Sequence, residues 1–331
     1  MQDYISIMPA DIRRPIEEEL ERYSRMFQET LTHEDDLLGQ ALEHIRGRKG
    51  KMMRPMLVLL VSKACGGVTE TSLRAAVALE ILHTASLVHD DVVDNSAQRR
   101  GAPAEHTLFG NKVAILVGDY LLSQCLHQAA LTGDLRIVDI IARLGGTLSE
   151  GEIRQLANIR AREVDENTYF HIIHHKTAAL FEACARLGAL AATATQQQIA
   201  DAARLGEIIG ICFQIRDDIF DYYPDATIGK PTAGDMAEGK LTLPAIHALS
   251  QVPPAHPAHT WAERVKALEA TSEDIRQLTE FTKQNGGIDY AHNAMESLRS
   301  EALPLITNMT SDEDVRNALT LYLDYTIRRT S

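Results

Sequence analysis

Long apolar runs with a helical period are the feature that most restricts what this 331-residue chain can fold into. Ala and Leu are abundant in these runs, and apolar residues recur every three to four positions instead of alternating. That period gathers apolar side chains on one face of a helix, whereas a half-buried strand needs strict alternation. The sequence therefore predicts an all-α protein.

Helical segments can be placed along most of the chain. We expect helices over residues 11–31, 34–46, 55–64, 71–94, 112–130, 135–158, 165–191, 199–222 and 243–250, and two or three more between 262 and 328. No Pro- or Gly-rich stretch cuts the chain in half, and its length gives ample material for a core. We therefore expect one domain over residues 1–331.

Composition narrows the class of function. The net charge of −13 argues against a nucleic-acid interface, which needs a basic face, but a local basic cluster can still bind an anionic substrate. The cysteines are scattered among apolar residues without a C-x-x-C pair, so we interpret them as reduced thiols of a cytoplasmic protein. They are Cys65, Cys125, Cys184 and Cys212. We identify no signal peptide and no apolar run of the roughly 20 residues that a membrane span needs.

Three aspartates end the expected helix 71–94. On a helix, Asp90 and Asp94 share a face, and Asp91 lies three residues before Asp94. Like charges this close repel one another, and the intervening Val92 and Val93 predict that the segment is buried. A cation would relieve the repulsion, and carboxylate oxygens suit Mg²⁺, which fills its remaining positions with water and substrate phosphate.

The same acid spacing occurs again at Asp217, Asp218 and Asp221, with apolar residues between the acids. A single Asp-Asp-x-x-Asp is weak evidence because a solvated helix face can carry one. Two copies on two apolar helices favour a metal site over surface charge. Six aspartates would balance the charge of three Mg²⁺ ions.

Two other clusters have plain structural explanations. The basic stretch around Lys51 and Arg54, taken alone, is more typical of a turn at a helix end. His171 has metal-ligand spacing to His174 or His175, but no nearby Cys or Glu completes a zinc set. We favour partly exposed histidines on an amphipathic helix.

Seven cations lie beside predicted loops and helix ends, enough to neutralise two diphosphate esters of roughly three charges each. They are Lys51, Arg54, Arg99, Arg100, Lys176, Lys230 and Lys240. Arginine suits forked contacts to phosphate oxygens, and lysine suits point-charge contacts. With two carboxylate clusters, and without a Ser/His/Asp or Cys/His arrangement or a Walker-type loop, the set points to metal-assisted departure of diphosphate.

These motifs resemble those of the trans-isoprenyl diphosphate synthases, the polyprenyl synthetase family, from about Gly50 to Pro244. The matching segments, in chain order, are Gly50-Lys51-Met52-Met53-Arg54-Pro55, His83 to Gly101, Gly118-Asp119, Lys176-Thr177, Phe213 to Tyr222, and Gly229 to Pro244. Lys49 stands where the family usually has a glycine, and Phe220 where leucine is common. Neither departure removes a charged contact.

The resemblance implies an isoprenoid-synthase helix bundle around a deep central cavity, usually a homodimer. It implies that Asp90, Asp91, Asp94, Asp217, Asp218 and Asp221 bind Mg²⁺, three ions in all. Lys51, Arg54, His83 and Arg100 match the family's isopentenyl diphosphate contacts. Arg99, Lys176, Thr177, Gln214, Lys230 and Lys240 match the contacts to the allylic diphosphate, and Lys176 is also counted among the catalytic residues.

The implied reaction is ionisation of the allylic diphosphate, attack by the isopentenyl double bond, and loss of a proton to the released diphosphate. In this family, the residues four and five positions before the first aspartate limit product length. Here they are the small Ser86 and Ala85. Helix 71–94 would be ~36 Å long, about seven or eight isoprene units, so we expect a product of about C30 to C50, of the kind used for quinone side chains.

Three alternatives stay open. A bulky residue deeper than Ala85 would make the chain a short-chain synthase with a C15 or C20 product. A class I terpene cyclase is disfavoured because Lys51, Arg54 and Arg100 imply a second diphosphate substrate. A non-catalytic subunit of a heteromeric synthase is the third, although such subunits typically lose acid-motif residues and this chain has all six.

Overall fold

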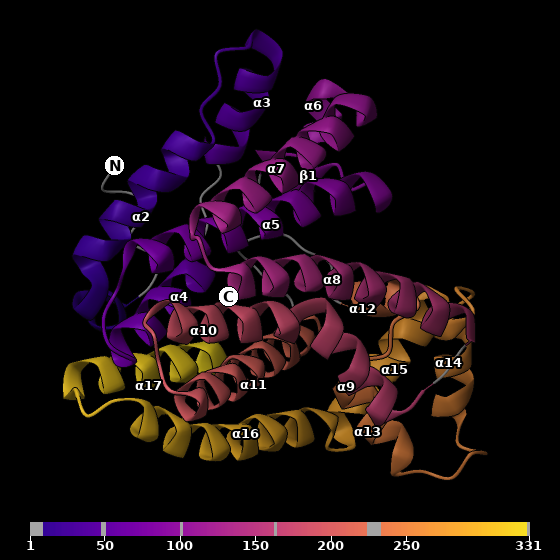
Figure 1. Ribbon diagram of the computed structural model, residues 1–331. Coiled ribbons are helices and arrows are strands. Elements are labelled where there is room, and N and C mark those ends of the chain that lie inside the picture. Colours follow the sequence, from indigo (N-terminus) through magenta and orange to yellow (C-terminus); the bar gives the residue numbers. More distant parts are fainter. Residues whose placement is uncertain (1–8, 48–50, 100–101, 162–163, 224–232, 330–331) are drawn as a thin grey trace. The chain divides into compact units, whose positions relative to one another are not determined.

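The computed structural model describes residues 9–47, 51–99, 102–161, 164–223 and 233–329 (Figure 1). Helices make up nearly all of the secondary structure in these ranges, which confirms the all-α prediction. The exception is a hairpin of two-residue strands, β1 (Gln98–Arg99) and β2 (Ala102–Pro103), in which Gln98 pairs with Pro103.

By its internal contacts the chain divides into two compact units. The first comprises Met1–Gly145, Ala183–Ala203 and Ile306–Leu321, and the second comprises Gly146–Glu182, Arg204–Leu305 and Tyr322–Ser331. The single-domain organisation expected from the sequence stays a prediction.

The first unit contains the N-terminal helices and the hairpin. Its elements besides β1 and β2 are α1 (Ala10–Arg13), the 3₁₀ turn η2 (Arg14–Ile16), α2 (Glu17–Thr30), α3 (Asp36–Gly47), α4 (Met53–Ala64), α5 (Glu70–Val93), α6 (Glu105–Phe109) and α7 (Asn111–Leu131). The second contains α9 (Glu166–Ile173), the π-helical turn η3 (His174–Ala178), α12 (Gly234–Ala237), α13 (Leu243–Ser250), α14 (Pro257–Lys266) and α15 (Ser272–Gln284). Residues of both units belong to α8 (Leu135–Ala161), α10 (Ala179–Ala191), α11 (Gln196–Phe220), α16 (Gly287–Met309) and α17 (Glu313–Arg328).

In the first unit, α5 packs beside α4 and α7 (Figure 1). A capping box starts α5: the Thr69 hydroxyl accepts from the Ser72 N–H, and the Ser72 hydroxyl accepts from the Thr69 N–H, both at 3.1 Å. Apolar side chains cover nearly the whole surface of α4, and ten of its twelve residues are buried. These neighbours fix the direction in which α5 presents its acidic end.

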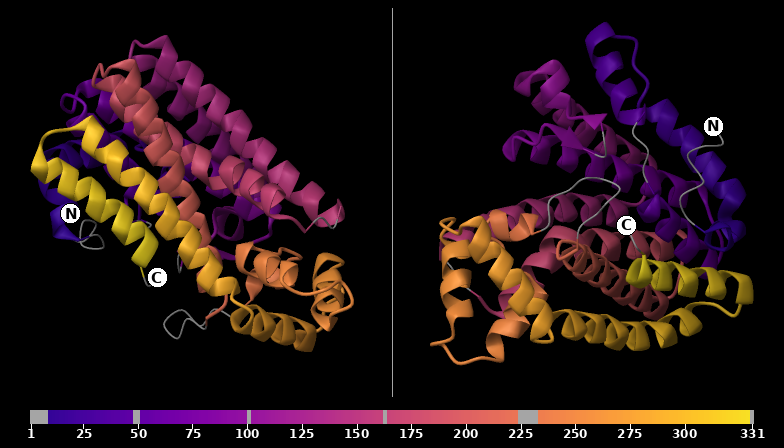
Figure 2. Two further views of the ribbon diagram at one scale, coloured as in Figure 1. Left: turned by 90° about the horizontal axis from the view of Figure 1, so that it is seen from below. Right: turned by 180° about the vertical axis from the view of Figure 1, so that it is seen from behind.

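In the second unit, α14 and α15 lie side by side, as the orange and gold segments of Figure 2 show. The expected helix 165–191 is instead the succession α9, η3 and α10, because a π-helical turn interrupts the α-helical pattern. Such turns occur often at functional sites.

The C-terminal part differs from the prediction of two or three helices, because it forms four, α14 to α17. Each break has a local cause. The side chain of Thr271 forms a capping box with Asp274 at the start of α15, and Gly286 has a φ of +75° before α16. The Asp312 side chain accepts from the Asp314 N–H at 2.9 Å before α17. Among the helices that the structure describes, none is long and apolar enough to cross a membrane.

Candidate active site

The first acid segment lies where α5 ends, in the first unit. Asp91 is completely buried, Asp90 is half-buried, and Asp94 is exposed at the C-cap, where its N–H donates to the Asp90 carbonyl at 2.8 Å. The prediction that the whole segment is buried is wrong for Val93, which is 74% exposed. The helix ends at this residue, so its last turn leaves the packed face and only one side of it, with Asp91, points inward.

Arg99 supplies the counter-charge of Asp91. Its Nε donates to Asp91 Oδ1 at 2.5 Å, and strand β1 positions it eight residues further along the chain. The other oxygen, Oδ2, is buried and has no hydrogen-bond partner among the residues that the structure describes. Within the described part of the chain, the lone pairs of Asp91 Oδ2 therefore accept no hydrogen bond, and a bound cation would provide the missing partner.

Lys51, Arg54 and His83 also belong to the first unit. Arg54 is the second residue of α4, which begins directly after the left-handed residue Met52, and His83 is a buried residue of α5. Burial raises the pKa of the Cys184 thiol, the Arg54 guanidinium opposes this rise, and Glu80 adds to it. Arg54 and Glu80 therefore lie close to the same thiol. Because α4 packs against α5, Arg54 and His83 are carried by neighbouring helices of the first unit.

The two residues expected to limit product length lie one turn before Asp90. Ala85 is fully buried, and the Ser86 hydroxyl donates to the His83 carbonyl at 2.9 Å. One further turn back, Leu82 is a buried, bulky residue. A Cβ on Gly145 would lie 4.0 Å from its Cδ1, and the Cys125 thiol of α7 lies beside its backbone.

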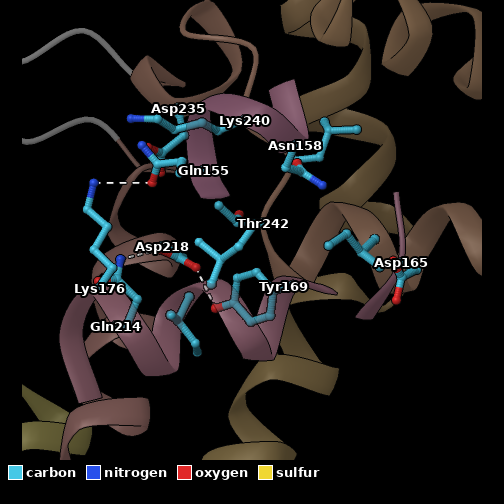
Figure 3. Close-up of a pocket in the computed structure, with 14 residues that line it drawn as sticks. Gln155, Asn158, Asp165, Tyr169, Lys176, Gln214, Asp218, Asp235, Lys240 and Thr242 are labelled. Carbon is cyan, nitrogen blue, oxygen red and sulfur yellow. Dashed lines mark hydrogen bonds between the residues drawn. The ribbon is translucent and has the colours of Figure 1, made fainter. Parts of the chain in front are cut away.

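The second acid segment has different surroundings, all within the second unit. Asp218 is buried and accepts two hydrogen bonds, from the Tyr169 hydroxyl at 2.6 Å and from Gln214 Nε2 at 2.8 Å (Figure 3). Burial, followed by the charge of Asp235, raises its pKa to about 8, although the two hydrogen bonds act in the opposite direction. Burial and Asp235 thus disfavour the ionised form of Asp218, and a bound cation would stabilise that form.

The other two acids of this segment hold parts of the chain that are distant in sequence. Asp217 Oδ1 accepts from Arg329 at 2.5 Å. Asp221 accepts from the backbone N–H groups of Gly234 and Asp235, both at 3.0 Å, and so fixes the start of α12. Asp221 therefore has a structural role in addition to the one that the sequence predicts.

The π-helical turn η3 carries Lys176 and Thr177. Two glycines allow α8 and α11 to pack closely against this turn. A Cβ on Gly151 of α8 would lie 2.9 Å from the backbone nitrogen of Lys176, and a Cβ on Gly210 of α11 would lie 2.5 Å from Ala178 Cα. The Thr177 hydroxyl donates to Gln214 Oε1 at 2.7 Å. This bond continues the chain of contacts from Gln214 to Asp218.

A cavity of about 200 Å³ opens at this point of the second unit (Figure 3). Lys176, Gln214, Asp218, Asp235 and Lys240 all line it. Lys176 Nζ lies 3.1 Å from Gln155 Oε1 and 2.8 Å from Glu152 Oε1, and Lys240 Nζ lies 2.5 Å from Glu238 Oε2. The walls therefore combine carboxylates with cations, a chemistry that suits a metal-bound anion.

The structure thus groups the predicted residues in two sets. The first unit holds Lys51, Arg54, His83, Ala85, Ser86, Asp90, Asp91, Asp94 and Arg99, and the second holds Lys176, Thr177, Gln214, Asp217, Asp218, Asp221 and Lys240. Arg100 and Lys230 lie outside the described residues. Because the two acid triplets belong to different units, their convergence on one pocket stays a prediction.

Three residues that act on the second acid segment were not among the residues predicted from the sequence. The Tyr169 hydroxyl donates to Asp218, and the charge of Asp235 raises the pKa of Asp218. Arg329 pairs with Asp217. Only Asp235 lies in a family motif, the segment from Gly229 to Pro244. The histidines are partly exposed, as expected: His171 is exposed, and His174 and His175 are half-buried. Two glutamates do lie near His174, whose Nε2 is 3.7 Å from Glu182 and 3.6 Å from Glu207.

The carboxylates fit a divalent metal in their chemistry. Asp91 has an unpartnered buried oxygen within the described chain, and Asp218 is a buried acid facing another acid. Across the described ranges, no three His, Cys, Asp or Glu side chains gather closely enough to form a complete ligand set. That arrangement is compatible with Mg²⁺, which takes only one or two protein carboxylates and otherwise binds water and phosphate.

Comparisons with known proteins agree with this chemistry. The model of the polyprenyl synthetase family matches residues 35–282. An octaprenyl diphosphate synthase from Haemophilus influenzae is 32% identical over 315 residues, which are 94% of each chain.

Solved structures match over nearly the whole chain. A geranylgeranyl pyrophosphate synthase from Bacteroides thetaiotaomicron is 46% identical with a TM-score of 0.84, covering 97% of this chain and 99% of its own. A polyprenyl synthase from Caulobacter crescentus, complexed with calcium and isoprenyl diphosphate, is 28% identical with a TM-score of 0.88, covering 97% and 98%.

Proposed function

We propose a product length for this chain, which belongs to the polyprenyl synthetase family and is a trans-prenyl diphosphate synthase. The proposed product is long, about C30 to C50. The family joins isopentenyl diphosphate to an allylic diphosphate, which makes the chain a prenyltransferase. The observation that supports the long product is the pair of small residues Ala85 and Ser86 one turn before Asp90. On α5, which is 24 residues and ~36 Å long, no aromatic side chain stands at these positions.

We propose that Asp90, Asp91, Asp94, Asp217, Asp218 and Asp221 hold three Mg²⁺ ions together with the allylic diphosphate. Bound Mg²⁺ would neutralise and orient the diphosphate and act as a Lewis acid on its oxygens. Arg99 and Asp91 already form a pair, so Arg99 can turn one face toward a phosphate while it orients the acid. Arginine suits this double role because its planar fork offers five donors.

The cations of the second unit would stabilise the departing diphosphate. Lys176 and Lys240 line the cavity, and each is held by a nearby carboxylate in this structure. Positioned charges of this kind stabilise the transition state because they need no reorganisation as charge develops. The proton lost after carbon–carbon bond formation would pass to the released diphosphate, so the reaction needs no basic side chain. The isopentenyl diphosphate contacts expected of Lys51, Arg54, His83 and Arg100 complete the proposal.

Product analysis tests the long-chain assignment. The purified chain is incubated with isopentenyl diphosphate, farnesyl diphosphate and Mg²⁺, and product length is determined by chromatography. Ala85→Phe is expected to shorten the product, because a ring at a fully buried position blocks a growing chain. Leu87→Phe is the control, since the same ring is then placed on another face of α5. An unchanged product from Ala85→Phe would contradict the assignment.

A short C20 product is the second candidate, because Leu82 fills the next turn of α5 and the Bacteroides structure bears a geranylgeranyl name. Leu82→Ala distinguishes the two. If Leu82 is the stop, this variant makes a longer product than the parent. If the chain already grows past Leu82, product length stays the same.

We also propose a homodimer in the cytoplasm. Three large apolar residues of α7, Ile115, Leu116 and Leu126, are 44%, 66% and 50% exposed in the single chain, and a second copy would cover them. Light scattering of Leu116→Glu should show loss of the dimer. Turnover by the purified chain alone would rule out the alternative of a non-catalytic subunit.

A further inference from the structure

The C-terminal Arg329 is almost completely buried, at 8% exposure, although it follows the last helix of the chain. Its Nη2 donates to Asp217 Oδ1 at 2.5 Å and to the Phe213 carbonyl at 3.2 Å. Its own carbonyl accepts from Arg216 Nε at 2.9 Å. A guanidinium is costly to bury, so its partners decide whether it can be kept there.

One face of α11 forms the binding site for this arginine. The guanidinium carbon lies 4.1 Å from the ring centroid of Phe213 and 5.3 Å from that of Phe220, and the same face carries Arg216 and Asp217. These four residues follow the spacing i, i+3, i+4 and i+7 of a helix face. The two rings and the carboxylate together hold the guanidinium through cation–π contacts and a charge-assisted hydrogen bond.

The contact leaves Asp217 accessible. The Asp217 side chain is 40% exposed, whereas that of Arg329 is 6% exposed, so the arginine approaches from the protein side and the carboxylate still reaches solvent. An arrangement in which a buried donor fixes one oxygen of an accessible carboxylate is typical of the hydrogen-bonded partners behind metal ligands.

We propose that Arg329 is a positioning residue that orients Asp217 for binding of a divalent cation. The inference rests on the proposed metal role of Asp217 and adds to it a residue 112 positions further along the chain. Arg329 stays in place when the cation binds, because the two rings and the Phe213 carbonyl hold it independently of Asp217.

Binding of Mn²⁺, an EPR-visible substitute for Mg²⁺, tests the proposal on the full chain with saturating inorganic diphosphate. Arg329→Met keeps the apolar stem over the two rings and removes the charge. We expect the Kd for Mn²⁺ to rise about 10- to 100-fold. Arg329→Lys should recover part of the loss. Arg328→Gln is the matched control, because the neighbouring Arg328 is 64% exposed and lies 3.9 Å from Glu296.

A double-mutant cycle separates orientation of Asp217 from mere stability of the chain end. Asp217→Asn should weaken Mn²⁺ binding, and adding Arg329→Met should then have no further effect. The proposal is overturned if Arg329→Met binds Mn²⁺ as the parent does, binds it more tightly, or has the same effect when Asp217→Asn is already present. If Asp217→Asn itself leaves Mn²⁺ binding unchanged, the proposed metal site is wrong as well, which distinguishes the two failures.

Discussion

The two acid segments have the same spacing, yet the structure gives them different surroundings. At the end of α5, the buried Asp91 pairs with a cation, Arg99, from the same stretch of sequence. At the end of α11, the buried Asp218 accepts from two neutral donors of the described chain, Tyr169 and Gln214, while Asp235 raises its pKa. Identical motifs can therefore differ in electrostatics, because the partners of a carboxylate depend on packing rather than on its own spacing.

The largest expected effect is on turnover, and here the two segments should behave alike. Asp91→Asn and Asp218→Asn should each lower kcat at least about 10²- to 10³-fold, because each removes a charge proposed to hold a metal at the departing diphosphate. Steady-state prenyl transfer measures this loss. Asp139→Asn is the control, since that acid is exposed and pairs with Arg143 on the surface of α8. A near-normal rate for either variant would remove that segment from the site.

Stability without metal should then separate the two segments. Asp91→Asn leaves Arg99 without its partner and should lower the free energy of unfolding by ~2–3 kcal/mol, less than for a fully buried pair because the Arg99 side chain is 28% exposed. Burial raises the pKa of the Asp218 carboxyl to about 8, so at pH 7 folding disfavours the ionised form that the unfolded chain carries, and this lowers stability. Asp218→Asn removes the ionisable group and with it this cost. Its stability should match or exceed that of the parent. Urea unfolding in the presence of EDTA measures both, and equal losses would contradict the comparison.

Tyr169 gives a smaller effect, specific to the second segment. Tyr169→Phe leaves a buried oxygen of Asp218 without its 2.6 Å donor and should cost ~1–2 kcal/mol of stability. Tyr290→Phe is the matched control, because that hydroxyl donates to Glu166 at 2.7 Å but is only part-buried, and its loss should cost less. Thermal unfolding of the two variants compares them. A larger loss for Tyr290→Phe would show that the bond to Asp218 contributes little.

The smallest effects concern the starts of the two helices, which are alike. Thr69 caps α5, and Thr195 caps α11 by accepting from the Gln198 N–H at 3.3 Å. Thr69→Ala and Thr195→Ala should each cost ~1 kcal/mol and leave kcat unchanged. Thermal unfolding and steady-state assays would check both values. A loss of turnover in either variant would mean that the acid segments depend on the far ends of their helices.

Most helices could be predicted from the sequence, because their apolar period and caps are local. The observed α13 matches the predicted 243–250, and α7 and α5 differ from prediction by one residue at each end. The π-helical turn at Lys176 and the four-part C-terminal region were not predicted. The first depends on Gly151 and Gly210, which allow neighbouring helices to approach, and the second on side-chain caps such as that of Thr271.

Periodicity and residue types at fixed spacing were enough to predict the all-α class and the family, and they also single out the acids that we propose for the site. Only the tertiary structure decided the partners of those acids. Tyr169 reaches Asp218 from 49 residues away and Arg329 reaches Asp217 from 112 residues away. The physical reason is that a buried carboxylate takes its pKa and its orientation from whichever groups pack against it, and spacing along the chain does not encode that packing.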